Sequence, residues 1–149
     1  MFKFKETIFA VSTPPGKSAV ALIRISGSLS YSCVRKISTN MPLKPNIATF
    51  NEIRTRESLI IDQTITTFFK SPKSFTGEDM VEITIHGSNA VVKKILSVLT
   101  ENKGLRLATP GEFTRRAFEN NKLDLTQVEA IADIVNAETE MQRKQAISH

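Results

Sequence analysis

The sequence predicts an α+β domain with a mixed β-sheet of five or six strands and two or three packed helices. Short runs rich in Val, Ile, Thr and Phe recur between Gly, Pro and Asn residues, which is typical of strands joined by turns. Other segments repeat apolar residues every three or four positions, as helices do. Because the two kinds of segment are intermixed, the helices are expected to pack against a sheet within one domain.

The first half of the chain is predicted to contain four strands and one short helix. The helix is expected within residues 28–38, because Leu29, Cys33 and Ile37 recur at every fourth position. A polar loop is expected at 70–79, after the last of these strands. The expected strands are residues 6–12, 19–25, 48–55 and 59–69.

The second half begins with a predicted strand at 80–87, in which polar and apolar residues alternate. A helix capped by Ser88 and closed by Gly104 is expected next, followed by a short strand at 105–109. The alternation in the first of these segments places Val81, Ile83 and Ile85 on one face of the sheet and Glu82, Thr84 and His86 on the other.

Two capping patterns predict the last helices. Thr109 is expected to be the N-cap of a helix that reaches about Asn120, with Glu112 completing a capping box. Asp124 is expected to cap a final helix. The apolar face of that helix would carry Leu125, Val128, Ala132 and Val135.

The final helix turns polar after Ala137 and has no stop signal. We therefore expect residues 1–120 to form one domain, and residues 121–149 to begin a second, helical domain whose remainder would cover the apolar face.

The composition is that of a globular protein of the cytoplasm. The chain has 149 residues, 40% of them hydrophobic, which suffices for a core. Its single cysteine excludes an internal disulfide framework, and no segment resembles a signal peptide or a membrane span. The net charge of +5 favours an anionic partner such as RNA, although the basic residues are scattered.

Residues 16–18, Gly-Lys-Ser, match the end of a nucleotide-binding phosphate loop. That loop requires a glycine where Val11 stands. Pro14 and Pro15 lack the N–H groups that would bind phosphates, and a strand-like segment follows where a helix is needed. A tight turn between strands is therefore predicted, rather than a self-sufficient nucleotide hydrolase.

Arg24 and Glu82 are charged residues inside strand-like apolar runs. Burying a lone charge is costly, so each is expected to have a partner. Two interpretations follow: an internal salt bridge, or a site where a fork-shaped cation and a carboxylate bind a polar, planar ligand. Lys122, in the turn before the final helix, is expected to be exposed or to face such a ligand.

Other polar residues are assigned structural roles. Glu78, Asp79, Glu82 and His86 lack the spacing of a metal site, so no metal is expected there. His86 ends a strand and is expected to be structural, and Cys33 is expected to pack in the core.

Three long motifs resemble the N-terminal region of a known family. They are STPPGKSAVALIRISG at 12–27, IDQTITTFFKSPKSFTGEDMVEITIHGS at 61–88, and ATPGEFTRRAFENNKLDLTQVEAIADIV at 108–135. In this order they resemble the bacterial tRNA modification GTPases of the MnmE family, also called TrmE, and they cover most of residues 6–137.

The resemblance implies a tetrahydrofolate-binding domain, related to the folate-binding domains of one-carbon enzymes, that forms a homodimer. It would bind 5-formyl- or 5,10-methylene-tetrahydrofolate. In the family, a helical domain with an inserted GTPase domain follows, which uses GTP, Mg²⁺ and K⁺. With the flavoprotein MnmG, such proteins install a C5 (carboxymethyl)aminomethyl group on the wobble uridine of tRNA. The GTPase domain and the family's C-terminal cysteine motif are absent here, so this chain alone is expected to have no GTPase activity.

By motif position, the family's folate-contacting arginine, glutamate and lysine correspond to Arg24, Glu82 and Lys122. The chain departs from the family pattern in two loops, at 17–19 and 87–89, where the family has more glycine or a Gly-Gly-Pro sequence. The alternative interpretation is a basic RNA-binding module without a cofactor.

Overall fold

A computed structural model describes residues 6–12 and 19–134, which form one six-stranded mixed sheet and four helices. The strands are β1 (Thr7–Ser12), β2 (Val20–Ser26), β3 (Thr49–Arg54), β4 (Ile60–Phe69), β5 (Met80–His86) and β6 (Leu105–Leu107). The helices are α1 (Ser30–Lys36), α2 (Asn89–Thr100), α3 (Glu112–Glu119) and a further helix over 125–134. The predicted α+β class is confirmed: three helices accompany the sheet, and the fourth is the predicted final helix.

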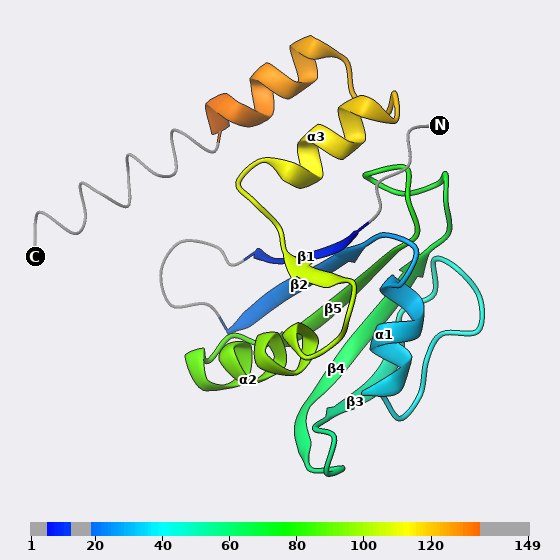
Figure 1. Ribbon diagram of the computed structural model, residues 1–149, viewed down its shortest axis with the longest axis vertical. Helices are drawn as coiled ribbons and strands as arrows, with labels where there is room; N and C mark the ends of the chain where they lie inside the picture. The colour runs from blue at the N-terminus through cyan, green and yellow to red at the C-terminus, as the bar shows by residue number, and fades with distance from the viewer. Residues whose placement is uncertain (1–5, 13–18, 135–149) are drawn as a thin grey trace, which may run out of the picture.

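The strands lie in the order β3-β4-β5-β2-β1-β6 (Figure 1). Neighbouring strands are antiparallel except β1 and β6, which are parallel. The register aligns Ala10, Arg24, Glu82 and Thr67 in one row across four strands. Arg24 and Glu82, which are far apart in sequence, are therefore direct neighbours at the centre of the sheet.

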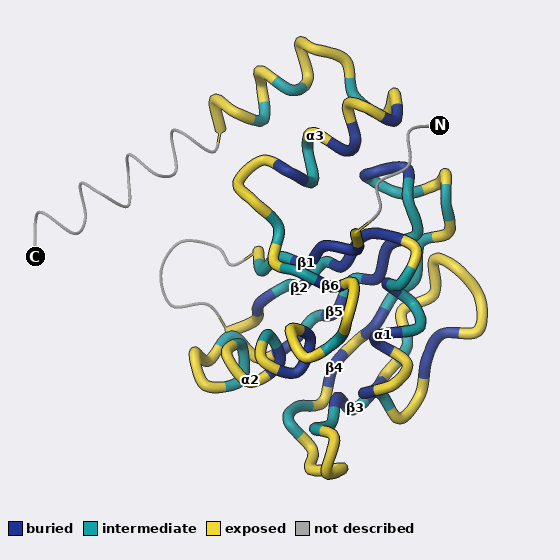
Figure 2. Tube along the Cα trace, in the orientation of Figure 1, coloured by how far each residue is buried: buried dark blue, intermediate teal, exposed yellow. Residues whose placement is uncertain are grey.

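The two faces of the sheet are covered differently. α1 and α2 pack on one face and enclose the core (Figure 1), to which β5 contributes Val81, Ile83 and Ile85 as predicted. Figure 2 shows that burial is concentrated along the central strands and the helix sides that face them. The opposite face carries Glu82 and is open over β3 and β4, where Phe50 is 64% exposed.

The start of α2 is as predicted, but its end is not. The Ser88 hydroxyl accepts a hydrogen bond from the Val91 N–H at 3.3 Å and caps the helix. The helix ends at Thr100, four residues before Gly104, which lies in a turn with a φ of 85°. Gly104 therefore serves the turn into β6 and does not close the helix.

α3 begins later than the capping pattern predicts. Its N-cap is Gly111, with a φ of 77°, and its first residue is Glu112. The Glu112 carboxylate still accepts the Thr109 N–H at 3.0 Å, so the predicted contact forms in the turn before the helix. The Glu112 N–H donates to the Thr109 carbonyl, and this turn delays the start of the helix.

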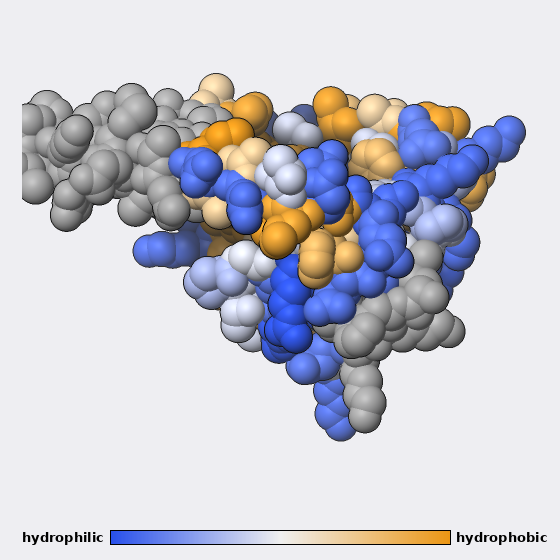
Figure 3. All heavy atoms as spheres, turned by 90° about the horizontal axis from the view of Figure 1, so that it is seen from above, coloured by the Kyte–Doolittle hydropathy of each residue, from blue (hydrophilic) through white to orange (hydrophobic). Residues whose placement is uncertain are grey.

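The helix over 125–134 begins as predicted. Asp124 accepts the Gln127 N–H at 2.8 Å, and the Gln127 side chain accepts the Asp124 N–H at the same distance. Figure 3 looks onto this end of the molecule and shows hydrophobic side chains at the surface among polar ones. A groove between this helix and α3 is lined by apolar residues that include Phe118, Leu125, Val128, Ile131 and Ala132.

Two expectations lie outside the described residues: the turn at 16–18 and the position of Val135 on the final helix. Of the helices described, none is both long and apolar enough to cross a membrane.

Candidate ligand-binding site

Arg24 on β2 and Glu82 on β5 form an ion pair across the two central strands. Arg24 Nε donates to Glu82 Oε1 at 3.1 Å, and the side chains remain 29% and 25% exposed. The apolar neighbours of these residues suggested burial in the core. Partial exposure is found because both side chains point to the sheet face that α1 and α2 leave uncovered. The internal pairing is therefore present, and the pair is also accessible to a ligand.

An aromatic ring lies beside this pair. Phe75, in the loop at 70–79, has its ring centroid 4.9 Å from Arg24 Cζ, which is within the range of a cation–π contact. Its side chain is partly exposed. A guanidinium group, a carboxylate and an aromatic ring thus meet at one point on the open face of the sheet.

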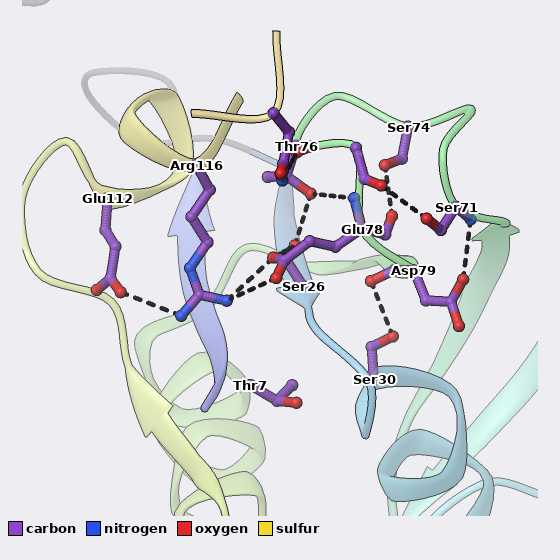
Figure 4. A network of polar contacts seen from close by, with 12 residues as sticks. Thr7, Ser26, Ser30, Ser71, Ser74, Thr76, Glu78, Asp79, Glu112 and Arg116 are labelled. Carbon is purple, nitrogen blue, oxygen red and sulfur yellow. Dashed lines mark hydrogen bonds and ion pairs between the residues drawn. The ribbon is translucent and has the colours of Figure 1, made fainter. Parts of the chain in front are cut away.

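The loop at 70–79 is fixed by polar contacts with other elements (Figure 4). The Ser26 hydroxyl of β2 donates to Glu78 Oε1 at 2.7 Å, and the Ser30 hydroxyl of α1 donates to the Asp79 carbonyl at 3.1 Å. Further bonds to loop groups run from Asn120 to Thr76, and from Ser71 to Asp79 and Gly77. Phe75 is therefore carried by a loop whose conformation the surrounding structure determines.

Arg116 of α3 is the centre of a buried charge cluster. Its side chain is 1% exposed and lies 3.0 Å from a Glu78 oxygen and 3.2 Å from a Glu112 oxygen. Arg106 of β6 binds Glu112 from the other side at 2.7 Å. The Arg106 hydrogen bonds are the largest cause that lowers the pKa of Glu112, to about 2, against the opposing effect of burial. This cluster joins α3 to β6 and to the loop beside Arg24.

Lys122 lies against the same loop. A Cβ atom at Gly77 would be 3.4 Å from Lys122 Cγ, so the stem of the lysine packs beside that glycine. The residue is exposed, and its backbone N–H donates to the Ala117 carbonyl. Among the described residues no contact joins Lys122 to Arg24 or Glu82. The structure therefore pairs two of the predicted residues and places the third on the neighbouring surface of the loop.

The acidic residues that the sequence analysis considered for a metal have separate partners. Glu78 pairs with Arg116, Asp79 with Lys70, Glu82 with Arg24, and His86 Nδ1 lies 2.6 Å from Asp62. Within residues 6–12 and 19–134, no group of three or more His, Cys, Asp or Glu side chains is arranged around a common point. The His86 N–H also donates to Asp62, which supports the structural role predicted for this histidine.

Cys33 is buried among apolar side chains of the core, as predicted. Burial raises the pKa of its thiol above the ordinary value, and this effect exceeds the opposing influence of Lys36. The thiol therefore packs as a small apolar group.

Phe75 and the Arg116 cluster were not predicted from the sequence. Phe75 is a single aromatic residue in a polar loop, and periodicity says nothing of where a loop side chain points. Arg116 follows Arg115 in an amphipathic helix, where one arginine is exposed and the other is buried. The signal for burial was the position of Arg116 at i+4 from Glu112, a spacing that allows an ion pair along a helix.

The arrangement around Arg24 can bind a flat, polar molecule. Glu82 accepts from Arg24 through Oε1, and its other oxygen has no partner among the described residues. That oxygen can accept an N–H group, Arg24 can face an anion or a carbonyl, and Phe75 offers a ring on which a planar group can stack.

The fold is that of an α+β domain whose open sheet face carries a partly exposed ion pair beside an aromatic ring. Residues 7–122 match the family described as "GTP-binding protein TrmE N-terminus". The chain belongs to this family.

Several curated relatives carry the name "tRNA modification GTPase MnmE". The protein from Dinoroseobacter shibae is 48% identical over 95% of this chain, and the one from Wolbachia sp. subsp. Drosophila simulans is 49% identical over 99%. The Ehrlichia chaffeensis protein is 51% identical over 95% of this chain. The chain spans about a third of the length of each of these relatives, 33%, 33% and 32% respectively.

Proposed function

We propose that residues 1–120 form a tetrahydrofolate-binding domain, and that Arg24 and Glu82 of this domain contact the ligand together with Lys122 from the segment that follows it. The observation that carries this proposal is the partly exposed Arg24–Glu82 pair, which lies beside Phe75 on the open sheet face. The same residues correspond by motif position to the family's folate contacts, and the chain belongs to that family.

The chemistry of a reduced folate matches this site. The pterin ring is planar and presents adjacent N–H donors, which a carboxylate such as Glu82 accepts. Its tail carries carboxylates, which Arg24 or Lys122 can neutralise. The ligand is 5-formyl- or 5,10-methylene-tetrahydrofolate. It supplies the one-carbon unit when bound, while the residues of this chain bind and orient it.

The proposal extends to the whole protein of which this chain is the N-terminal part. It is supported by relatives named for tRNA modification and for GTPase activity, which this chain matches over a third of their length. We infer that the whole protein works in the cytoplasm with the flavoprotein MnmG and modifies C5 of the wobble uridine of tRNA. GTP, Mg²⁺ and K⁺ are assigned to its GTPase domain, and residues 121–149 to the start of its helical domain.

We also propose that this domain forms a homodimer. The uncovered sheet face carries exposed apolar side chains on three strands, Val20, Phe50 and Ile65, and they line a shallow groove of about 220 Å³. Exposed apolar groups that are gathered on one face favour association. Light scattering on the purified chain tests whether it forms a homodimer, and the mass of a dimer is expected. The mass of a monomer at all concentrations contradicts the proposal.

Isothermal titration calorimetry with 5-formyl-tetrahydrofolate tests ligand binding. Saturable binding by the wild type is expected, and its loss in Arg24→Ala and in Glu82→Ala. Arg35→Ala, which removes an exposed arginine from α1, serves as the matched control and is expected to bind as the wild type does. Absence of binding by a folded wild-type dimer contradicts the proposal.

A basic RNA-binding module without a cofactor is the second candidate, and the net charge of +5 favours it. It predicts an affinity for tRNA that falls steeply with salt and does not depend on Arg24 or Glu82. Gel mobility of tRNA at low salt, with and without the folate, distinguishes the two functions.

A further inference from the structure

A cavity of about 580 Å³ lies away from the proposed folate site and shares none of its residues. It lies between the C-terminal ends of α1 and α2 and the turn that joins β3 to β4, elements that are adjacent in Figure 1. Its wall contains three cationic side chains, Lys36, Arg54 and Arg56. The other lining residues carry hydroxyl, amide or apolar side chains, and none of the described lining residues is a carboxylate.

Two hydrogen-bond donors in this wall lack partners. Ser38 Oγ and Arg54 Nε are buried atoms without a hydrogen bond among the described residues. Buried polar groups are nearly always paired, and an unpaired one suggests an ion or a ligand that completes the site. Arg54 Nε and the Lys36 and Arg56 head groups can only donate, and the Ser38 hydroxyl can donate as well, so a single acceptor can complete the site.

Acidic residues beside the cavity offset part of its positive charge. One of them is Glu57, which lies between the lining residues Arg56 and Ser58 and interacts electrostatically with Arg56. Arg54 Nη2 lies 3.2 Å from Glu52 Oε1, so this carboxylate occupies one edge of the guanidinium group. Arg56 meets Glu101 at 3.3 Å, but both side chains are well exposed, and such a pair is weak. The lining residues themselves therefore carry a net positive charge, and Lys36 is the cation among them that lacks an acidic partner in the described part of the chain.

The C-terminal ends of two helices point toward this region, and free carbonyl groups there would repel an anion. The carbonyls at these ends are engaged instead. The Asn102 amide donates to the carbonyls of Val98 and Leu99 at 3.3 and 3.4 Å. At the end of α1, the N–H groups of Ile37 and Ser38 donate to carbonyls of the last turn.

We propose that this cavity is a binding site for a phosphate group, held by Lys36, Arg54 and Arg56 with the hydroxyl of Ser38. The phosphate belongs to an RNA backbone. The net charge of +5 and the relatives' name, which specifies tRNA modification, both favour RNA as its source. The proposal does not depend on folate binding, because the two sites share no residue.

The test compares two double variants that remove equal charge. Lys36→Ala/Arg56→Ala removes two exposed cations from the cavity wall, and Arg35→Ala/Lys44→Ala removes two exposed cations outside it. Binding of a fluorescent tRNA anticodon stem-loop is measured by anisotropy at several salt concentrations. The cavity variant is expected to bind about tenfold more weakly, with a salt slope smaller by about one because one phosphate contact is lost, and the control to change less than twofold. Thermal unfolding verifies that both variants are folded.

A second arm identifies the source of the phosphate. Inorganic phosphate is titrated into the ¹⁵N-labelled wild type, and shifts of the Ser38 and Asn102 amides are expected. Phosphate shifts without any RNA effect would assign the site to a free phosphate-bearing ligand and overturn RNA as the source. Equal weakening of RNA binding in both double variants, or no phosphate shift at Ser38, would overturn the site itself.

Discussion

Two arginine–carboxylate groups lie close together in this fold and differ in almost every physical respect. Arg116 is 1% exposed and contacts two carboxylates, of Glu78 and Glu112. Arg24 is 29% exposed, and it has one carboxylate partner, Glu82, through a single hydrogen bond. The first group joins three elements, whereas the second joins two strands that the sheet already pairs.

The difference indicates which group maintains the fold and which is available for a ligand. A buried charge cluster strongly destabilises a protein when one member is removed, because the others stay buried without a partner. A half-exposed pair contributes little, because water solvates either charge when the other is lost. Arg24 and Glu82 can therefore replace their mutual contact by contacts with a ligand at a small cost in free energy, and the residues of the Arg116 cluster cannot.

The largest effect is expected for Arg116→Ala. It leaves Glu78 and Glu112 buried without their shared cation and is expected to lower the free energy of unfolding by about 3–5 kcal/mol. Urea denaturation measures this change. Arg115→Ala, an exposed neighbour on α3, is the matched control and is expected to change it by less than about 0.5 kcal/mol. Equal effects of the two substitutions would remove the distinction between the two arginine groups.

Glu112→Gln tests the same cluster through pH. The pKa of Glu112 in the folded protein is about 2, below its ordinary value of 4.5. A lowered carboxyl pKa stabilises the protein above pH 4.5, and this contribution is lost as the pH falls toward 2. At pH 7 we expect the free energy of unfolding of the variant to be about 2 kcal/mol below that of the wild type, a value that allows for the solvent around Arg106. As the pH falls, the free energy of unfolding is expected to decrease less in the variant than in the wild type.

Urea denaturation at pH 7, 4 and 3 measures this difference. Glu119→Gln replaces an exposed carboxylate on the same helix and is the control, with wild-type pH dependence expected. If Glu112→Gln and the wild type lose stability in parallel between pH 4.5 and 3, the carboxylate of Glu112 does not stabilise the fold in the way described.

Phe75→Ala sharpens the comparison at the exposed pair. The ring lies over Arg24 and offers a stacking surface, so its loss is expected to weaken binding of 5-formyl-tetrahydrofolate about tenfold. Phe75→Tyr keeps the ring and is expected to bind within about twofold of the wild type. Calorimetry measures both affinities. Wild-type affinity in Phe75→Ala would exclude the ring from the site without affecting the assignment of Arg24 and Glu82.

The smallest effect is expected for Lys122→Ala. The lysine is exposed and lies on the neighbouring surface of the 70–79 loop, so it contributes a screened charge to the ligand's tail. Binding is expected to weaken about threefold at low salt and to approach that of the wild type at about 0.5 M salt. A salt-independent loss of binding would mean that Lys122 makes a direct, desolvated contact.

The periodicity of a sequence predicts which face of a strand or helix a residue lies on, and the predictions that depended on this were the ones that succeeded. The alternation of β5 correctly separated Ile83 from Glu82, and the strand register then brought Glu82 to Arg24. Periodicity does not say whether a second layer covers a sheet face, so the exposure of this pair was not foreseen. The start of α3 was misplaced because Glu112 makes its predicted contact with Thr109 from a turn.

The buried cluster shows a further limit of sequence reasoning. Arg116 and Glu78 are 38 residues apart, and their contact depends on how α3 docks over the end of the sheet. No local pattern specifies that docking. Phe75 likewise reaches Arg24 only because Ser26, Ser30 and Asn120 hold its loop in place.

The most direct test measures the free energy of unfolding of the wild type and of Arg24→Ala, each with and without 5-formyl-tetrahydrofolate. Without ligand, the two proteins are expected to agree within about 1 kcal/mol, because the pair is half exposed. With ligand at one hundred times its dissociation constant, the wild type is expected to gain about 2.7 kcal/mol and the variant almost nothing. A variant that is several kcal/mol less stable without ligand, yet gains as much from the ligand as the wild type, would show that the pair is structural and that the folate binds elsewhere.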